Sequence, residues 1–261
     1  MISIRWPAVL TLLAVTAVGV MAFGWPFLVR PESGLAHGHD APWLFAVLLG
    51  LLALVLLAEV SGGGLDAKTV AVLGVLAAMG GALRVLSAGT AGLEPMFFLV
   101  VLAGRVLGRG MGFVLGALAV LTGAFLTGGI GPWAPFQMIC AGWVGLGAAL
   151  LPRAVTGRAE RLMLAAYGMV VGMAYGAVMN LWFWPFMGSS APTGAGFVPG
   201  ADVATNLGHY GAFYLATSLG WDVPRGLLTA ALVLIAGKSV LATLRRAVRR
   251  AAFDAPVTFE D

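Results

Sequence analysis

Long apolar stretches, separated by short polar or glycine-rich breaks, run through most of the chain. We interpret them as helices, because a bilayer crossing needs about 20 mainly apolar residues. The predicted spans are 8–28, 43–60, 69–88, 95–108, 112–128, 135–151, 162–186 and 226–244. The span 95–108 is short for a crossing, which is tolerated when protein rather than lipid surrounds it. A ninth, shallower helix is predicted around Thr205–Leu219, after a long loop.

The composition supports a membrane protein and argues against a soluble one. Hydrophobic residues make up 60% of the chain and charged residues only 10%. A soluble domain of this length would need far more polar surface. No polar linker is long enough to separate two domains. We therefore predict an all-α polytopic membrane protein, and we interpret its first span as a retained helix rather than a cleaved signal peptide.

The distribution of lysine and arginine predicts the orientation in the membrane. If the N-terminus lies in the cytoplasm, the alternating loops place 12 of the 15 basic residues on the cytoplasmic side. Only Arg30, Arg84 and Arg225 then face outward. This distribution predicts a multi-pass protein of the cell membrane with both termini cytoplasmic. The outer loops are 29–42, 89–94, 129–134 and 187–225.

Glycines recur at intervals of four, which lets helices approach closely in lipid. One series is Gly104, Gly108, Gly112 and Gly116, and another is Gly168, Gly172 and Gly176. Some of these series must serve internal packing, and a stripe of small residues left over would be a docking face. The run Gly128–Met138 contains Gly-Pro-Trp-Ala-Pro and cannot be helical throughout, so we expect a stiff outer loop there.

Arg84 and Glu94 are the first candidate pair on the outer side. Arg84 lies near the outer end of its span, and Glu94 begins the next one after a glycine-containing turn. One interpretation is an ion pair that pins this turn. The other is a fork of guanidinium donors for an anionic or amide-bearing ligand. The two interpretations are compatible.

A second group of candidates combines aromatic rings with amides. Asn180 lies four residues before Trp184, so a continuous helix would place both on one face. With Trp133 and Gln137 they predict a flat aromatic slot for a planar or large heteroaromatic solute. His209 and Tyr210, on the predicted shallow helix, are further candidates for substrate binding. Asp222 is expected to cap the last helix, a structural role.

The sequence offers no sign of catalysis or of a bound metal. It has no phosphate-binding GxxxxGK[ST] loop, no catalytic triad and no cysteine cluster, since Cys140 is the single cysteine. The histidines of His37-Gly-His-Asp40 favour a solvated outer loop over a metal site. We predict a protein that is not an enzyme and has no catalytic residue, metal or cofactor. A membrane-embedded enzyme and a non-transporting membrane scaffold remain alternatives.

Four segments resemble the substrate-binding S-component of energy-coupling factor (ECF) vitamin transporters. They are AAMGGALRVL, GLEPMFFLVVLAGRVLG, GFVLGALAVLTGAFLTGGIGPWAPFQM and LATSLGWDVPRGLL, and the likeness extends over about residues 70–245. The resemblance implies a six-helix substrate-capture core at 63–250, preceded by two additional N-terminal transmembrane helices at 1–62 and followed by a cytoplasmic tail at 251–261.

The resemblance also implies a function and a set of partners. Such a subunit captures a vitamin at the outer face and topples in the bilayer to release it. A transmembrane coupling subunit and two ATPase subunits supply the energy, and no nucleic acid is involved. The small-residue face that docks the coupling subunit maps onto Ala78 and Ala82. The tryptophan-rich, weakly charged outer face favours cobalamin or a related precursor as the substrate.

Overall fold

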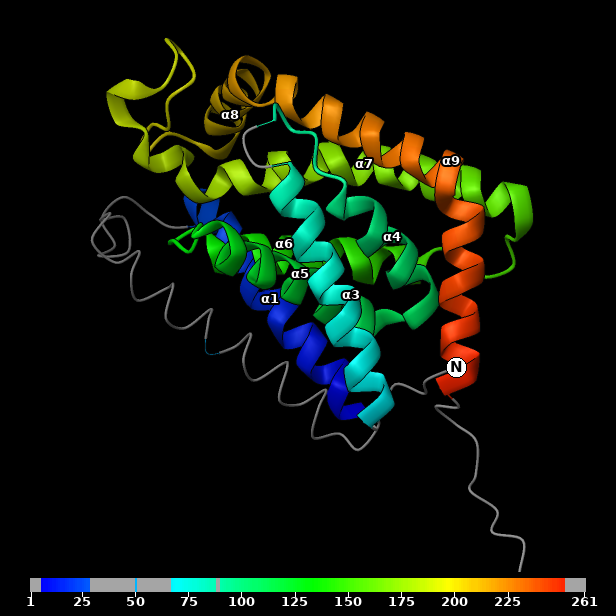
Figure 1. Ribbon diagram of the computed structural model, residues 1–261. Coiled ribbons are helices and arrows are strands. Elements are labelled where there is room, and N and C mark those ends of the chain that lie inside the picture. The colour runs from blue at the N-terminus through cyan, green and yellow to red at the C-terminus, as the bar shows by residue number, and fades with distance from the viewer. Residues whose placement is uncertain (1–5, 29–49, 51–66, 88–89, 252–261) are drawn as a thin grey trace, which may run out of the picture.

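The protein is a bundle of helices (Figure 1). The computed structural model describes residues 6–28, 50, 67–87 and 90–251, and this part contains no strand. The helices are α1 (Trp6–Leu28), α3 (Ala67–Leu86), α4 (Met96–Leu107), α5 (Arg109–Thr127), α6 (Ala134–Leu150), α7 (Gly157–Phe183), α8 (Val203–Thr217) and α9 (Leu219–Ala251). Two short 3-10 helices, η2 (Trp184–Phe186) and η3 (Gly188–Ser190), follow α7.

The prediction of an all-α polytopic membrane protein is confirmed. Seven of the predicted spans and the shallow helix are present, whereas the span 43–60 and the tail 252–261 lie outside the described residues. Within the described part, four helices are long and apolar enough to cross a membrane: Val9–Phe27, Arg109–Thr127, Gly157–Phe186 and Leu219–Arg249. The last helix begins earlier than predicted, at Leu219, because it continues through Pro224.

The short helix α4 lies at the centre of the bundle. It contacts α3, α5, α6, α7 and α9, and most of its side chains are buried, including Met96, Phe97 and Leu102. A helix of 12 residues is too short to span a bilayer alone. Because its neighbours enclose it, the expectation that protein surrounds this span is confirmed.

Glycines bring α5 and α6 into backbone contact. A Cβ on Gly112 or Gly145 would overlap the carbonyl oxygen of the other, and a Cβ on Gly116 would overlap that of Ala141. Gly104 at the end of α4 faces Gly145 in the same way. Gly108 has a different role, because its φ of 95° separates α4 from α5. Three members of this glycine series therefore pack the core, and the fourth, Gly108, forms the break between the two helices.

The second glycine series joins α7 to α9. Gly168 faces Thr229, Gly172 faces the backbone of Gly226, and Gly176 faces the carboxylate of Asp222. Any side chain larger than hydrogen at Gly172 would strike the α9 backbone at 2.6 Å. This stripe packs against α9 inside the protein, so it is not available as a docking face.

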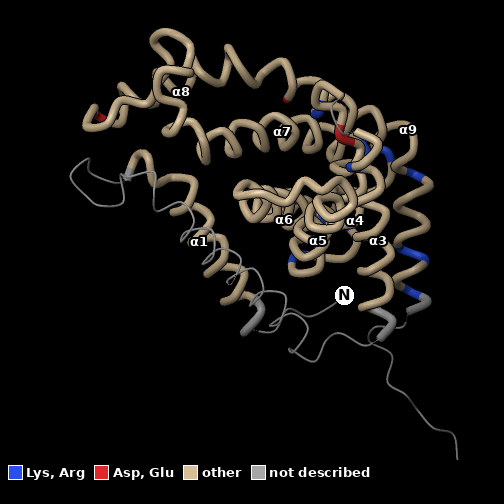
Figure 2. The backbone as a smooth tube through the Cα atoms, turned by 60° about the vertical axis from the view of Figure 1, so that its left-hand side comes forward, with Lys and Arg blue, Asp and Glu red and all other residues tan. Residues whose placement is uncertain are grey.

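Basic side chains collect at one end of the bundle, which charge counting predicts to be cytoplasmic. Figure 2 shows lysine and arginine along the C-terminal half of α9. Glu160 of α7, only 1% exposed, accepts from Arg105 Nε at 2.8 Å and from Arg245 Nη2 at 2.7 Å. Arg105 also donates to the carbonyls of Leu151 and Pro152. This cluster fastens α4, α7, α9 and the α6–α7 loop together at the basic end.

Candidate functional site

Arg84 and Gln137 meet at the opposite end of the bundle. Arg84 lies in the last turn of α3, and its Nη2 donates to Oε1 of Gln137 in the first turns of α6 at 2.6 Å. Its aliphatic stem crosses α5 at Gly123, where an added Cβ would lie 2.5 Å from the Arg84 Cδ. The arginine thus extends over α5 toward α6. The absence of a side chain at Gly123 makes that path available.

Aromatic rings lie near Gln137 at the start of α6. Trp133 precedes α6 by one residue, and Gln137 N donates to Trp133 O at 3.0 Å, so the two side chains are one turn apart on the same face. The Trp133 ring is 39% exposed and meets the Trp182 ring edge to face, with centroids 6.4 Å apart. Trp182 also packs on Phe136 at 5.6 Å. We call Arg84, Trp133, Gln137 and Trp182 the Arg84 cluster.

The loop between α5 and α6 positions Trp133. Gly128 ends α5 in the left-handed region with φ 66°, and α6 begins at Ala134 with Pro135 in its first turn. Trp133 Nε1 donates back to the Gly129 carbonyl at 3.2 Å, which fixes its ring over the loop. The prediction that this run is partly non-helical is confirmed.

Glu94 does not pair with Arg84, so the predicted ion pair across the α3–α4 turn is wrong. Its Oε2 accepts from Nε of Arg225 on α9 at 2.9 Å. Gly92, with φ 79°, lies against the backbone of Trp221 and brings this loop onto the start of α9. The close approach of loop and helix therefore gives Glu94 a partner that is distant in sequence.

Asp222 is not the N-terminal cap of α9, so the expectation that it caps the last helix is wrong. The helix begins three residues earlier, and the Asp222 side chain is buried inside the bundle, where it accepts from Arg225 Nη1. The Arg225 guanidinium also lies over the rings of Tyr175 at 5.1 Å and Phe97 at 5.8 Å. Among the described residues, Asp222 Oδ2 is the buried side-chain oxygen without a hydrogen-bond partner.

Asn180 and Trp184 diverge from the predicted slot. Asn180 donates through Nδ2 to Oγ of Ser218, which joins α7 to the α8–α9 junction. Trp184 is fully buried, and its Nε1 donates to the Ala195 carbonyl at 2.8 Å. The Trp184 backbone N–H donates to the Asn180 carbonyl, so the two residues lie one turn apart on one face, as predicted, but both side chains are buried and have partners within the protein. Trp182, not Trp184, is the ring that meets Trp133.

His209 and Tyr210 belong to the layer that α8 forms over the end of α7. His209 Nδ1 is 2.8 Å from the Gly196 carbonyl, and the Tyr210 hydroxyl donates to the Ala177 carbonyl. The Tyr210 ring packs edge to face on Trp184 at 5.0 Å. Burial raises the pKa of the Tyr210 hydroxyl, so it stays protonated and remains a donor at any physiological pH. Tyr210 therefore holds α8 against α7, while His209 joins α8 to the loop that precedes it.

The helix α3 exposes a stripe of small residues on the side away from α5. Gly80 and Gly81 face α5, whereas Ala78 and Ala82 are exposed. Toward the basic end the stripe continues to Gly74, where an added Cβ would meet no atom within 4 Å. Unlike the two glycine series of α4–α5 and α7, this stripe is not covered by internal packing.

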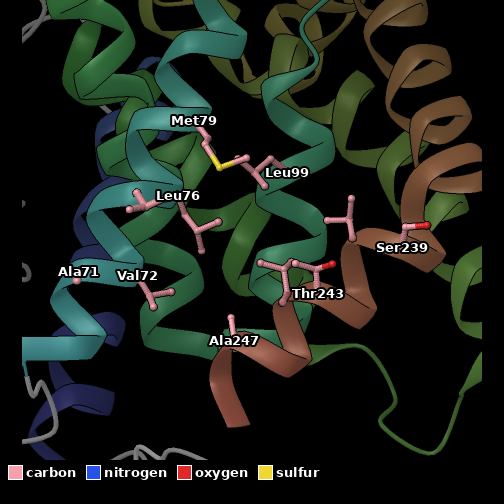
Figure 3. A pocket seen from close by; sticks show the side chains of 11 residues that line it. Ala71, Val72, Leu76, Met79, Leu99, Ser239, Thr243 and Ala247 are labelled. Carbon is pink, nitrogen blue, oxygen red and sulfur yellow. The ribbon is translucent and has the colours of Figure 1, made fainter. Parts of the chain in front are cut away.

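A groove of about 470 Å³ lies beside this stripe, between α3 and α9 (Figure 3). Its walls are almost entirely apolar, with Ser239 and Thr243 of α9 as its two hydroxyl-bearing side chains and Leu99 of α4 between the two helices. The residues that line it are Ala71, Val72, Val75, Leu76, Met79, Leu99, Ser239, Val240, Thr243, Leu244 and Ala247. It lies toward the basic end of the bundle and contains none of the predicted substrate-binding residues.

Metal binding finds no support in the described part of the chain, where no three His, Cys, Asp or Glu side chains are grouped as ligands. The His37–Asp40 segment lies outside the described residues. Two contacts were not predicted from the sequence, that of Trp182 with Trp133 and that of Arg225 with Glu94. Both join segments far apart in the chain, so local spacing gave no signal for them.

Comparison with protein families gives one match of high coverage. Residues 68–237 match the family described as ECF transporter, substrate-specific component. The matched range runs from the first turn of α3 into α9, so it includes the whole Arg84 cluster and the small-residue stripe of α3. No curated protein and no solved structure matches the chain.

Proposed function

Because the chain belongs to the substrate-specific components of ECF transporters, we propose that it captures a vitamin-like small molecule at the outer face of the cell membrane for ATP-driven uptake. The observation that carries the proposal is the Arg84 cluster. It combines a guanidinium, an amide and two tryptophan rings at the end of the bundle opposite the basic residues. Small-molecule sites typically consist of an apolar wall with a few placed polar groups.

The family implies association with the membrane-coupling and ATPase subunits of the transporter. We propose that the coupling subunit docks on the α3 stripe at Ala78 and Ala82, next to the apolar groove. Helices associate in lipid through close backbone approach at small residues, and this stripe is exposed. The neighbouring groove offers an apolar surface where a further helix from the partner can pack.

Cobalamin or a related precursor is the substrate that we propose within this class. Trp133 and Trp182 provide ring surface for a large solute, and Gln137 provides amide donors for the many carbonyl groups of such a molecule. The proposed site residues from the sequence are regrouped accordingly. Arg84, Trp133 and Gln137 contact the ligand, while Glu94, Asn180, Trp184, His209 and Tyr210 hold the surrounding loops and helices.

The alternatives are a membrane-embedded enzyme and a scaffold without a ligand. An enzyme needs a free acid, base or nucleophile, whereas Glu160 and Asp222, the buried carboxylates of the described residues, are both bound to arginine. A scaffold needs no exposed tryptophan beside an arginine. Family members are transporter components, which favours transport over both alternatives.

Uptake of labelled cyanocobalamin tests this proposal. The chain is expressed with a coupling subunit and two ATPases in cells that lack their own cobalamin uptake, and it is omitted in the control. We expect labelled cyanocobalamin to accumulate only when both the chain and ATP hydrolysis are present. An excess of the unlabelled substrate should abolish this accumulation. If neither cyanocobalamin nor any vitamin in a competing panel is taken up in a chain-dependent way, the capture function is contradicted.

A further inference from the structure

The two arginines on the predicted outer side differ in how their charge is compensated. Arg225 binds two carboxylates, Glu94 and Asp222. Arg84 instead binds the neutral amide of Gln137, and no carboxylate of the described residues lies within ion-pair distance of it. A guanidinium does not lose its proton, so it keeps a full charge at this position.

An arginine near a helix end in a membrane commonly extends its side chain to the bilayer surface. The Arg84 stem lies along Gly123 of α5, with an added Cβ there falling 2.5 to 3.2 Å from its Cδ, Cβ and Cγ, and its tip reaches Gln137 on α6. The guanidinium therefore binds the side chain that lies one helical turn after Trp133.

Donors remain available at the tip of this arginine. A guanidinium has five N–H groups, and one nitrogen, Nη2, is bonded to Gln137. Gln137 uses its oxygen in that bond, and its amide N–H groups make no hydrogen bond to another of the described residues. Among the described residues, the buried side-chain atom without a hydrogen-bond partner is Asp222 Oδ2. The N–H groups of Arg84 and Gln137 that lack a partner are therefore not buried.

We propose that Arg84 binds an anionic oxygen group of the transported molecule, a carboxylate or a phosphate. This inference rests on the proposed function and narrows its substrate class. Gln137 holds the guanidinium in place and donates its amide N–H groups beside it, while Trp133 and Trp182 cover the ring system attached to the anion. Planar guanidinium donors match the geometry of carboxylate and phosphate oxygens, and charge-assisted bonds are about twice as strong as neutral ones.

Matched pairs of ligands, identical except for the anion, test the proposal on the purified chain in lipid nanodiscs. Pantothenate with pantothenol and biotin with biotinamide test a carboxylate. Cobinamide phosphate with cobinamide tests a phosphate. By isothermal titration, we expect the anionic member of at least one pair to bind about tenfold or more tightly than its neutral counterpart, as expected for loss of one charged hydrogen bond. This wild-type comparison requires no variant to fold.

Variants then assign the preference to Arg84. Arg84→Gln should reduce the ratio of the two affinities to about one, and Arg84→Lys should retain part of it because the charge remains. Gly123→Val, which leaves the arginine in the chain but obstructs its stem, should also reduce the ratio. Equal binding of both members by the wild type, or an unchanged ratio in Arg84→Gln, overturns the inference and leaves the proposed function intact. If no member of any pair binds, this inference is overturned, whereas the capture function is decided separately by the uptake measurement.

Discussion

Arg225 Nε donates to Glu94 Oε2 at 2.9 Å and so joins the start of α9 to the start of α4. The two residues are 131 positions apart in the chain. Asp222, one helical turn before Arg225, is the second carboxylate on the same guanidinium. The loop between α3 and α4, which follows Arg84, is thus attached to α9 close to the proposed site.

Removing the arginine of this cluster should cost more stability than removing Glu94. Arg225→Gln leaves the 1%-exposed Asp222 without its cation, and breaking a buried pair in this way costs roughly 3–5 kcal/mol. Glu94→Gln removes a partly exposed carboxylate and leaves the Arg225–Asp222 pair in place. Thermal unfolding in detergent should show a clearly larger loss for Arg225→Gln. Equal losses would contradict the account of this cluster.

The backbone contact between α5 and α6 predicts a sharp difference between two glycine substitutions. Gly145→Ala would place its Cβ on the carbonyl of Gly112, so the helices must separate, and overpacking of this kind costs about 1–3 kcal/mol or more. Gly74→Ala, where a Cβ meets nothing, should be neutral or stabilise α3 by up to about 1 kcal/mol. Melting temperatures of the two variants measure the difference. A harmless Gly145→Ala would show that the helices are not in backbone contact.

The exposed stripe of α3 predicts where the coupling subunit binds. Ala78→Trp and Ala82→Trp should prevent close approach of a partner helix and abolish co-purification with the coupling subunit, because small residues set the distance between helices in lipid. Ligand binding by the isolated chain should persist. Val170→Trp on α7, also on an exposed site at 63%, is the matched control and should retain the partner. If the control and the α3 variants behave alike, the stripe is not the docking face.

The exposed ring at the proposed site should matter for ligand binding and little for folding. Trp133→Ala removes ring surface that covers the ligand, and loss of an aromatic contact there should weaken affinity by about tenfold or more. Phe125→Ala at the end of α5, where the ring is 67% exposed, removes a comparable aromatic without effect on binding. Titration of both variants with the identified ligand provides the comparison. Unchanged affinity in Trp133→Ala would remove this ring from the site.

The positions of the helices could be predicted from the sequence because an apolar run in lipid has few alternatives to a helix. The same reasoning predicted that α4 is enclosed by protein and that the run before Trp133 is partly non-helical. Partners across helices could not be predicted in this way. Arg84 was matched with Glu94 because they are close in the chain, whereas the fold joins Glu94 to a residue 131 positions away.

The residues that surround Trp133 could be predicted only in part, for a related physical reason. Trp133 and Gln137 follow from one local turn of α6, so their shared face could be inferred from spacing. The face shared by Asn180 and Trp184 also follows from spacing, since the Trp184 N–H donates to the Asn180 carbonyl. The neighbours of that face could not be inferred from spacing. In the fold, Trp184 packs on Tyr210 of α8, whereas Trp182 meets Trp133.

Native mass spectrometry of the purified chain tests the capture function most directly. The chain is isolated from cells grown with a full panel of vitamins, together with a Trp133→Ala/Gln137→Ala variant of equal melting temperature. We expect a one-to-one complex between the wild-type chain and a small molecule, and its loss from the variant. A wild-type chain that carries no small molecule under any of these conditions, and binds none when vitamins are added, would contradict the proposed function.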